Sequence, residues 1–219
     1  MFVENRAGAN GITGTESVLK SAPDGHHLVV VVAAHVINAS LQARLPFDPV
    51  ADVAPVTLIA RSPWVVVITP SVPAHDLREF VAYAKANPGK LRFGSSEPSS
   101  RLAGEQFKQQ AGIDLQHVAY KGGSQIMTDM LGGHIESGFP EYETYAWYGM
   151  YAPKGTPRAV VGRIQQEIAR IVRLPDMQER LNQFGAEPIA STPEEFGAFT
   201  RAEHDKFARL VKQAAIQPE

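Results

Sequence analysis

The sequence predicts an α/β fold in which helices pack on a largely parallel sheet, and three observations support this prediction. Between residues 90 and 131 the chain alternates strand, helix, strand and helix, which is typical of parallel βαβ units. A continuous apolar run over 28–33 is typical of a strand buried on both faces of such a sheet. The chain also has 18 glycines and 16 prolines among 219 residues, which indicates many turns and therefore many short elements.

Hydrophobic periodicity and turn residues place the elements of the first 131 residues in order. Gly112 follows a helical pattern and is expected to close that helix as its C′ residue. The expected series is helix 14–21, strands 28–33, 56–60 and 64–69, helix 76–86, strand 90–95, helix 99–111, strand 115–119 and helix 123–131.

An aromatic strand over 145–152 and three helices are expected in the remaining chain. Thr156 is predicted as the N-cap of the first helix, with Pro157 at its first position. Thr192 and Glu195 form the capping box of the third. Apolar stripes on these helices are predicted to face the core, and those of the second and third helices consist of Met177, Leu181 and Phe184, and of Phe196, Phe199, Phe207, Leu210 and Val211.

Composition excludes several classes of protein. The chain has no cysteine, so thiol catalysis, disulfides and thiolate metal sites are excluded. The formal net charge of −2 argues against a nucleic-acid partner, because such proteins carry a basic surplus. The longest apolar run has seven residues, Leu28 to Ala34, so direct membrane insertion is not expected.

Motifs for catalysis, metals and cofactors are weak. The seven histidines show no helical i, i+4 pair, so neither a metal nor a cofactor is expected. Ser17 and Lys20 match the Ser-x-x-Lys pattern of acyl-serine enzymes, but the partner motifs of that class are absent. A small serine hydrolase or lyase using these two residues is kept as an alternative, against the simpler reading of an exposed helix face.

Two strand-to-helix turns are the more informative feature. The first turn spans 95–100 and is rich in serine, and the second spans 120–124 and contains Lys121 and two glycines. Helix N-termini attract anions, and ligands of open α/β sheets lie beyond the carboxyl ends of the strands. The two turns therefore predict a site for a small acid, and the alternative is that the serines only cap helices.

Several motifs in this order resemble the Bug (TctC-like) family, the substrate-binding receptors of tripartite tricarboxylate transporters. The resemblance covers nearly the whole chain. Its motifs are V-E-N-R-A-G-A at 3–9 (with Ala7 where the family has proline), A-P-D-G at 22–25, H-V-I-N-A-S-L at 35–41, L-P-F-D-P-V at 45–50, A-N-P-G-K-L at 86–91, L-A-G-E at 102–105, Y-K-G-G at 120–123, L-G-G at 131–133, A-W-Y-G at 146–149 and A-P-K-G-T-P at 152–157.

The resemblance implies a type II periplasmic binding protein fold, with two lobes of central mixed sheets flanked by helices. Residues 1–64 plus 147–219 would form one lobe and 65–146 the other. It implies a non-catalytic, periplasmic receptor that holds a small carboxylate, such as a di- or tricarboxylate, an amino acid or an aromatic acid, and passes it to membrane permease subunits. The implied binding residues are His35 and Asn38 on the first lobe, and Ser95, Ser96, Ser99, Ser100, Tyr120, Lys121 and Gly122 on the second.

The chain departs from the family pattern at three places. Residues 1–6 lack the features of an export signal, and the family's first strand and glycine-rich loop are not present before Val3. A start at Met1 would therefore mean a cytoplasmic protein. Several tens of residues are missing where Gly133 passes almost directly to Phe139 and Pro140, and the serine turn is shorter than usual. An alternative function follows: a truncated remnant that does not bind solute and acts as a sensor or interaction module, with exposed apolar surface that self-associates.

Overall fold

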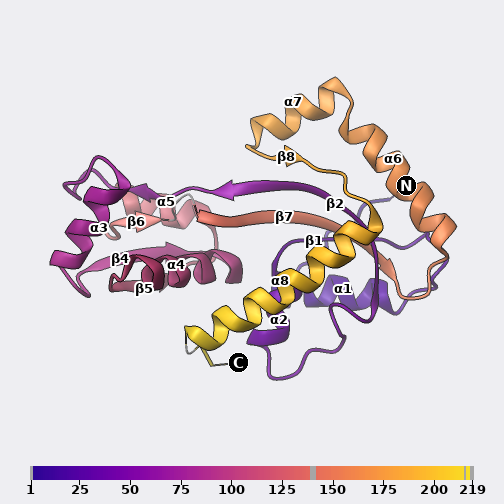
Figure 1. Cartoon of the computed structure of the whole chain (residues 1–219), viewed down its shortest axis with the longest axis horizontal. Coiled ribbons are helices and arrows are strands. Elements are labelled where there is room, and N and C mark those ends of the chain that lie inside the picture. The colour runs from indigo at the N-terminus through magenta and orange to yellow at the C-terminus, as the bar shows by residue number, and fades with distance from the viewer. Residues whose placement is uncertain (1, 139–141, 215, 218–219) are drawn as a thin grey trace. The chain divides into compact units, whose positions relative to one another are not determined.

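The computed structural model describes residues 2–138, 142–214 and 216–217, and the chain divides into two compact units. Unit 1 comprises Met1–Ser62 and Ala146–Glu219, and unit 2 comprises Pro63–Tyr145. Each unit has its own sheet flanked by helices, as the predicted fold class requires. The chain passes between the units within the two longest strands, β2 (Val53–Trp64) and β7 (Tyr142–Pro153) (Figure 1).

Unit 1 contains a four-stranded sheet in the order β1-β7-β2-β8. β1 pairs antiparallel with β7, and β8 pairs antiparallel with β2. The bounds of its remaining elements are η1 (Ala9–Gly11), α1 (Ile12–Leu19), β1 (Val29–Val31), α2 (Ala34–Leu41), α6 (Arg158–Val172), α7 (Pro175–Gln183), β8 (Glu187–Pro188) and α8 (Pro193–Gln213).

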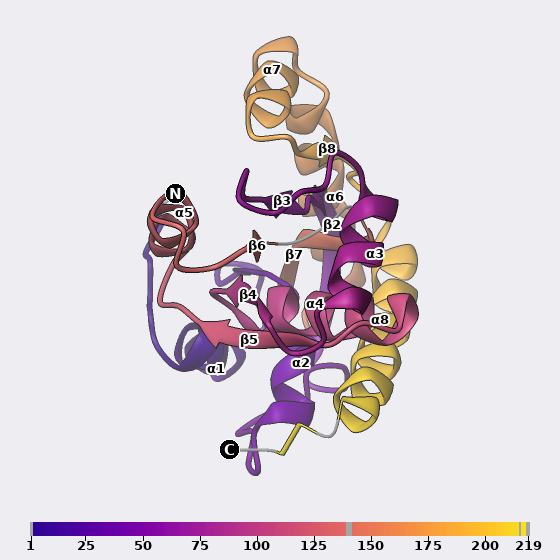
Figure 2. The ribbon, with the colours of Figure 1, turned by 90° about the vertical axis from the view of Figure 1, so that its left-hand side faces the viewer.

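The core of unit 1 forms where α8 packs against α2 and β7 (Figures 1 and 2). α8 begins at the predicted capping box, in which Thr192 accepts from the Glu195 amide. The ring of Phe196 lies 4.7 Å from that of Tyr151. Gly149 makes this approach possible, because a Cβ at that position would lie 2.1 Å from the Phe196 ring.

Three predictions for unit 1 were wrong. The strand at 28–33 is not buried in a parallel sheet: β1 is a short antiparallel edge strand, and Val30 is 56% exposed because alternate residues of a strand point to opposite faces. Thr156 does not cap α6; its hydroxyl donates to the Pro153 carbonyl at 2.7 Å, and Pro157 is the N-cap. Phe184 is not core, since it follows the last turn of α7 and is 82% exposed.

Unit 2 contains a four-stranded sheet in the order β3-β6-β4-β5. β4 runs parallel to β5, as the strand–helix alternation predicts. β4 also runs parallel to β6, a strand that was not predicted, and β3 pairs antiparallel with β6. The bounds of its elements are β3 (Val67–Ile68), α3 (Leu77–Ala86), β4 (Leu91–Ser95), α4 (Pro98–Ala111), β5 (Leu115–Ala119), α5 (Gly123–Leu131) and β6 (Ser137–Gly138).

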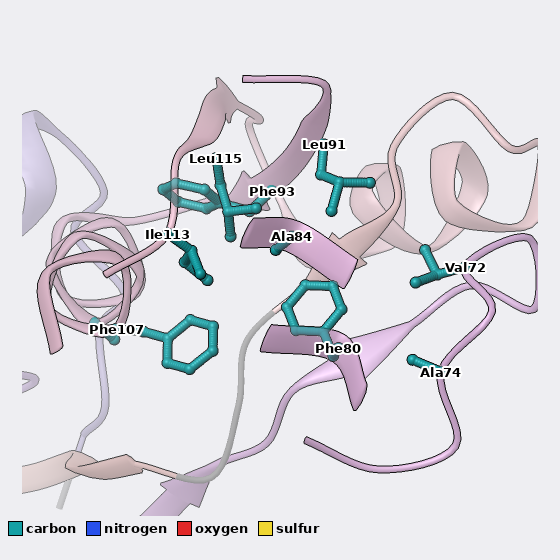
Figure 3. Close-up of a cluster of buried hydrophobic side chains, with 10 residues drawn as sticks. Val72, Ala74, Phe80, Ala84, Leu91, Phe93, Phe107, Ile113 and Leu115 are labelled. Atoms are coloured by element: carbon teal, nitrogen blue, oxygen red, sulfur yellow. The ribbon is translucent and has the colours of Figure 1, made fainter. Parts of the chain in front are cut away.

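The core of unit 2 lies between this sheet and helices α3 and α4. Phe80 of α3 and Phe107 of α4 stack with their ring centroids 6.3 Å apart, beside Phe93 of β4 and Leu115 of β5 (Figure 3). α4 ends at Gly112 with φ of 61°, which confirms the predicted glycine stop. This core holds the carboxyl ends of β4 and β5, where the two predicted turns begin.

Some features of the chain lie outside the described residues. Met1 is one of them, and so are Phe139 and Pro140, which follow the predicted internal shortening. Within the described part of the chain, no helix combines the length and the apolar character needed to cross a membrane.

Candidate functional site

The two predicted turns lie side by side in unit 2. β4 and β5 are adjacent parallel strands with Ser95 in register with Ala119, so both strands end at the same edge of the sheet. The Tyr120 amide donates to the Ser95 carbonyl at 2.8 Å and extends the pairing into the turns. Two segments 25 residues apart in the sequence thus meet at the carboxyl edge of one sheet, the edge at which α/β proteins bind ligands.

Two of the four serine hydroxyl groups of the serine turn, residues 95–100, form hydrogen bonds within the turn. Ser100 Oγ accepts from the amides of Ser96 and Glu97, both at 3.3 Å, and donates to the Glu97 carbonyl at 2.9 Å. The Ser99 hydroxyl donates to the Glu97 carboxylate. Because Pro98 at the first position of α4 has no N–H, this helix start also offers one amide fewer than usual. The turn is therefore built mainly as a cap.

Ser95 lies at the end of β4 and bonds across to β5. It is only 4% exposed, and its Oγ lies 2.6 Å from His117 Nε2. Burial and, to a lesser degree, the nearby positive charge of Arg101 lower the pKa of His117. A neutral imidazole suits this contact, and the bond ties the two strands together directly beneath the turns.

Glu97 bears on the electrostatics of the turn. It is the N-cap of α4, and burial raises the pKa of its carboxyl group, partly offset by the hydrogen bond from Ser99. A raised pKa means that burial disfavours the charged carboxylate. Burial therefore disfavours the negative charge of Glu97, the group of the serine turn that would repel an anion.

The lysine turn, residues 120–124, is the more open of the two. Gly122 is the N-cap of α5 and has no side chain, and the amides of Gly123 and Ser124 belong to the first helical turn, where no intrahelical acceptor exists. Lys121 is exposed, while its own amide donates to Gln125 Oε1 at 3.0 Å. This combination of helix N-terminus, flanking glycine and ammonium group is well suited to a carboxylate.

Tyr120 connects the lysine turn to α5. Its hydroxyl donates to Asp129 Oδ2 at 2.7 Å, and loss of solvation together with this carboxylate raises the pKa of Tyr120 to about 12. The phenol is therefore protonated at any physiological pH and serves to hold α5 against the strand end. Gly94 leaves room for it, since a Cβ there would lie 3.1 Å from the Tyr120 ring.

The two candidate residues of unit 1 are buried on α2. His35 is 4% exposed, and its Nε2–H donates to the Pro49 carbonyl at 2.9 Å. Burial lowers its pKa to about 4. Asn38 is 1% exposed and donates to the Asn10 carbonyl at 3.1 Å. Each side chain thus holds a loop in place, and the acceptor atoms His35 Nδ1 and Asn38 Oδ1 remain buried without a protein partner.

The Ser17 and Lys20 side chains do not support a catalytic dyad. The Ser17 hydroxyl accepts from the Arg6 guanidinium, and the Lys20 ammonium pairs with Glu16 at 2.6 Å. In the described part of the chain, histidine, aspartate and glutamate side chains do not gather into groups of three that could hold a metal ion.

Sequence reasoning missed the groups that support the turns. His117 faces Ser95 only because β4 and β5 pair in parallel, so a predicted register was the signal that could have found it. Asp129 lies nine residues after Tyr120, at the far end of α5, and no local motif marks this pair. Asn10, whose carbonyl accepts from Asn38, lies in η1 with a φ of 51°, and no motif in the sequence marks this contact.

Comparison with known families identifies the protein. The sequence model of the tripartite tricarboxylate transporter family receptor, TctC, matches residues 1–140 and 135–216. The chain belongs to this family. This family consists of substrate-binding receptors and not of enzymes.

Relatives and solved structures agree with this assignment. The chain is 29% identical to a UPF0065 protein in the tcbD-tcbE intergenic region of Pseudomonas sp. strain P51, over 96% of this chain and 76% of the relative. It is 26% identical to BugT of Bordetella pertussis, over 99% of this chain and 80% of BugT.

Three solved structures share the fold. A periplasmic transporter is 30% identical, with a TM-score of 0.85 over 99% of this chain and 87% of its own. Rpa4515 of R. palustris, solved with adipate, has a TM-score of 0.86 at 23% identity, over 100% of this chain and 87% of Rpa4515. MatC of Rhodopseudomonas palustris, solved with malate, has a TM-score of 0.75 at 21% identity, over 93% and 85%.

The matches also bear on the predicted internal shortening. The family model matches in two stretches that overlap at 135–140, which adjoins the point where residues are expected to be missing. The alignments with the two relatives run over 254 and 261 residues, more than the 219 of this chain. These relatives therefore have internal residues that have no counterpart here.

Proposed function

We propose that this receptor binds a small carboxylate at the paired turns of unit 2 and passes it to the permease of a tripartite transporter in the periplasm. The observation that carries the proposal is the in-register pairing of β4 and β5, which brings the serine and lysine turns to one edge. Lys121 and the first amides of α5 would bind the carboxylate, and the serine turn would form the adjoining wall.

The proposal assigns different roles to the nine candidate residues. Lys121 and Gly122 contact the ligand, and Ser96 contributes a hydroxyl from the neighbouring turn. The others support loops: Ser95, Ser99, Ser100 and Tyr120 support the two turns of unit 2. His35 and Asn38 hold loops of unit 1. We also propose that units 1 and 2 are the two lobes, with residues 1–64 plus 147–219 in one and 65–146 in the other.

A ligand panel tests the carboxylate. Citrate, malate, adipate, aspartate, glutamate and terephthalate are added in turn to a thermal melt, with adipamide as the uncharged control. A ligand that binds the native state raises the melting midpoint, so we expect at least one acid and not the diamide to do so. No shift with any acid would contradict a working receptor.

The site itself is tested by paired lysine variants. Lys121→Gln removes the ammonium group of the lysine turn, whereas Lys90→Gln removes an equally exposed one before the amino end of β4. We expect calorimetry to show weaker acid binding for Lys121→Gln alone. Equal loss in both variants would mean that general surface charge, and not the turn, attracts the acid.

A second function, as a self-associating interaction module, is favoured by one specific observation. Val30 of the edge strand β1 is 56% exposed, and Val32, the residue after this strand, is 37% exposed. Unpaired apolar strand edges pair readily with other strands. Light scattering over a range of protein concentrations tests this function. Self-association requires that the measured mass rises with concentration, and that the Val30→Lys variant has a lower mass than the unaltered chain.

A further inference from the structure

A hollow of about 510 Å³ lies within unit 1, apart from every residue assigned above to carboxylate binding. It is open to solvent and is lined by the end of α2, the loop over 42–50 and the middle of α8. The two helices pack on each other (Figure 1). This volume falls within the range of sites for small molecules.

Hydrogen bonds at two points hold the loop that forms one wall of the hollow. Asp48 Oδ1 accepts from the amides of Val50 and Ala51, each at 2.8 Å, and closes a tight turn. The Pro49 carbonyl accepts from the buried His35 side chain. A wall anchored at both points is formed before any ligand arrives, which reduces the entropy cost of binding.

The lining combines an apolar wall with charges of both signs. Leu45 and Phe47 supply apolar surface. Arg201, His204 and Asp205 of α8 lie on one face of that helix, because residues three and four apart are neighbours.

The charges are separated into two poles. His204 Nδ1 lies 3.3 Å from Asp205 Oδ1, and Asp48 lines the same hollow. The hollow therefore contains two carboxylates, and the pKa of Asp48 is lowered mainly by the two amides of its own turn. Arg201 lies about one helical turn, roughly 5 Å, towards the start of α8. Its guanidinium forms no salt bridge in the described part of the chain.

We infer that this hollow binds a small zwitterion with an apolar body. The ligand's carboxylate would pair with Arg201, its ammonium group with Asp48 and Asp205, and its apolar part would cover Phe47. A simple anion would be repelled by the two carboxylates, and a simple cation by Arg201. Only a molecule carrying both charges satisfies both poles.

Leucine and two analogues that each lack one charge test the inference by calorimetry. We expect leucine to bind at one site, and 4-methylpentanoate and 3-methylbutylamine to bind at least tenfold more weakly. Equal affinity of all three compounds, or no binding of leucine at millimolar concentration, would overturn the inference.

Variants locate the binding. Arg201→Gln and Asp205→Asn should each weaken leucine binding about tenfold, whereas Arg209→Gln, an exposed arginine of the same helix that does not line the hollow, should have no effect. Equal affinity in Arg201→Gln and Arg209→Gln would contradict the assigned pairing.

A filling variant separates this site from the carboxylate site of unit 2. Ala43 lines the hollow and is exposed, so Ala43→Trp should block leucine without lowering the melting midpoint. Lys121→Gln should leave leucine binding unchanged. Full leucine affinity in Ala43→Trp, or its loss in Lys121→Gln, would show that leucine binds elsewhere and would overturn the inference.

Discussion

The candidate residues of the two units differ in what their polar groups contact. In unit 1, His35 and Asn38 are buried and bonded to backbone carbonyls of their own unit. In unit 2, Lys121 is exposed next to the open N-terminus of α5. The residues suggested by the family resemblance therefore include some that hold loops in place and others that are accessible to a ligand. Their contacts in the structure distinguish the two groups.

The largest expected effect concerns His35 and acid. The unfolded imidazole has a pKa of 6.5, and burial lowers the folded value to about 4. Between these values the unfolded chain binds a proton that the folded chain does not, so the free energy of unfolding falls as pH drops from 6.5 to 4. This pKa shift sets an upper limit of about 3 kcal/mol on the loss in the free energy of unfolding.

Denaturant unfolding at pH 7 and at pH 4.5 measures this loss. His35→Gln can still donate to the Pro49 carbonyl but does not titrate, so it should lose less stability in acid than the unaltered chain. The exposed His75→Gln serves as the control and should behave like the unaltered chain. Equal acid sensitivity in His35→Gln would contradict a buried, neutral His35.

Ser100 offers the next largest effect, in unit 2. Its hydroxyl joins two amides and one carbonyl of the serine turn, so Ser100→Ala should lower the free energy of unfolding by about 1–2 kcal/mol. Ser124→Ala in the exposed lysine turn should cost less than about 0.5 kcal/mol. Similar costs in chemical denaturation would remove the distinction between a cap and an open turn.

Lys121 should change binding without changing stability. An exposed ammonium group paired with a ligand carboxylate contributes modestly, so Lys121→Gln should weaken the best acid of the panel about two- to fivefold. The melting midpoint without ligand should not move. A loss of stability in Lys121→Gln would place this residue with the loop-building groups.

Ser96 gives the smallest expected effect. It is half-buried and its backbone, not its hydroxyl, bonds to Ser100. Ser96→Ala should leave the melting midpoint within about 1 °C and weaken acid binding only about twofold, by loss of one hydrogen bond that water replaces. A large drop in the midpoint would mean that Ser96 also belongs to the cap.

Local signals in the sequence were enough for most elements of unit 2 and for the start of α8. Helix α5 has the predicted bounds, Gly123–Leu131, because glycine pairs flank it on both sides. The glycine stop of α4 and the capping box at Thr192 were also predicted correctly. Each of these depends on residues within one helical turn, so neighbouring letters of the sequence contain the whole interaction.

Contacts between distant segments were decided only by the tertiary structure. The valine run at 28–33 indicated burial, but strand pairing placed β1 at a sheet edge. The bond from Ser95 to His117 requires the register of β4 and β5, and the hollow of unit 1 joins a loop near residue 48 to a helix near residue 204. The sequence by itself determined many of the strands, helices and turns, because backbone preference is local, but it did not predict helix α2 or the two-residue strands β6 and β8. Which polar groups face one another depends on long-range packing, which no short motif contains.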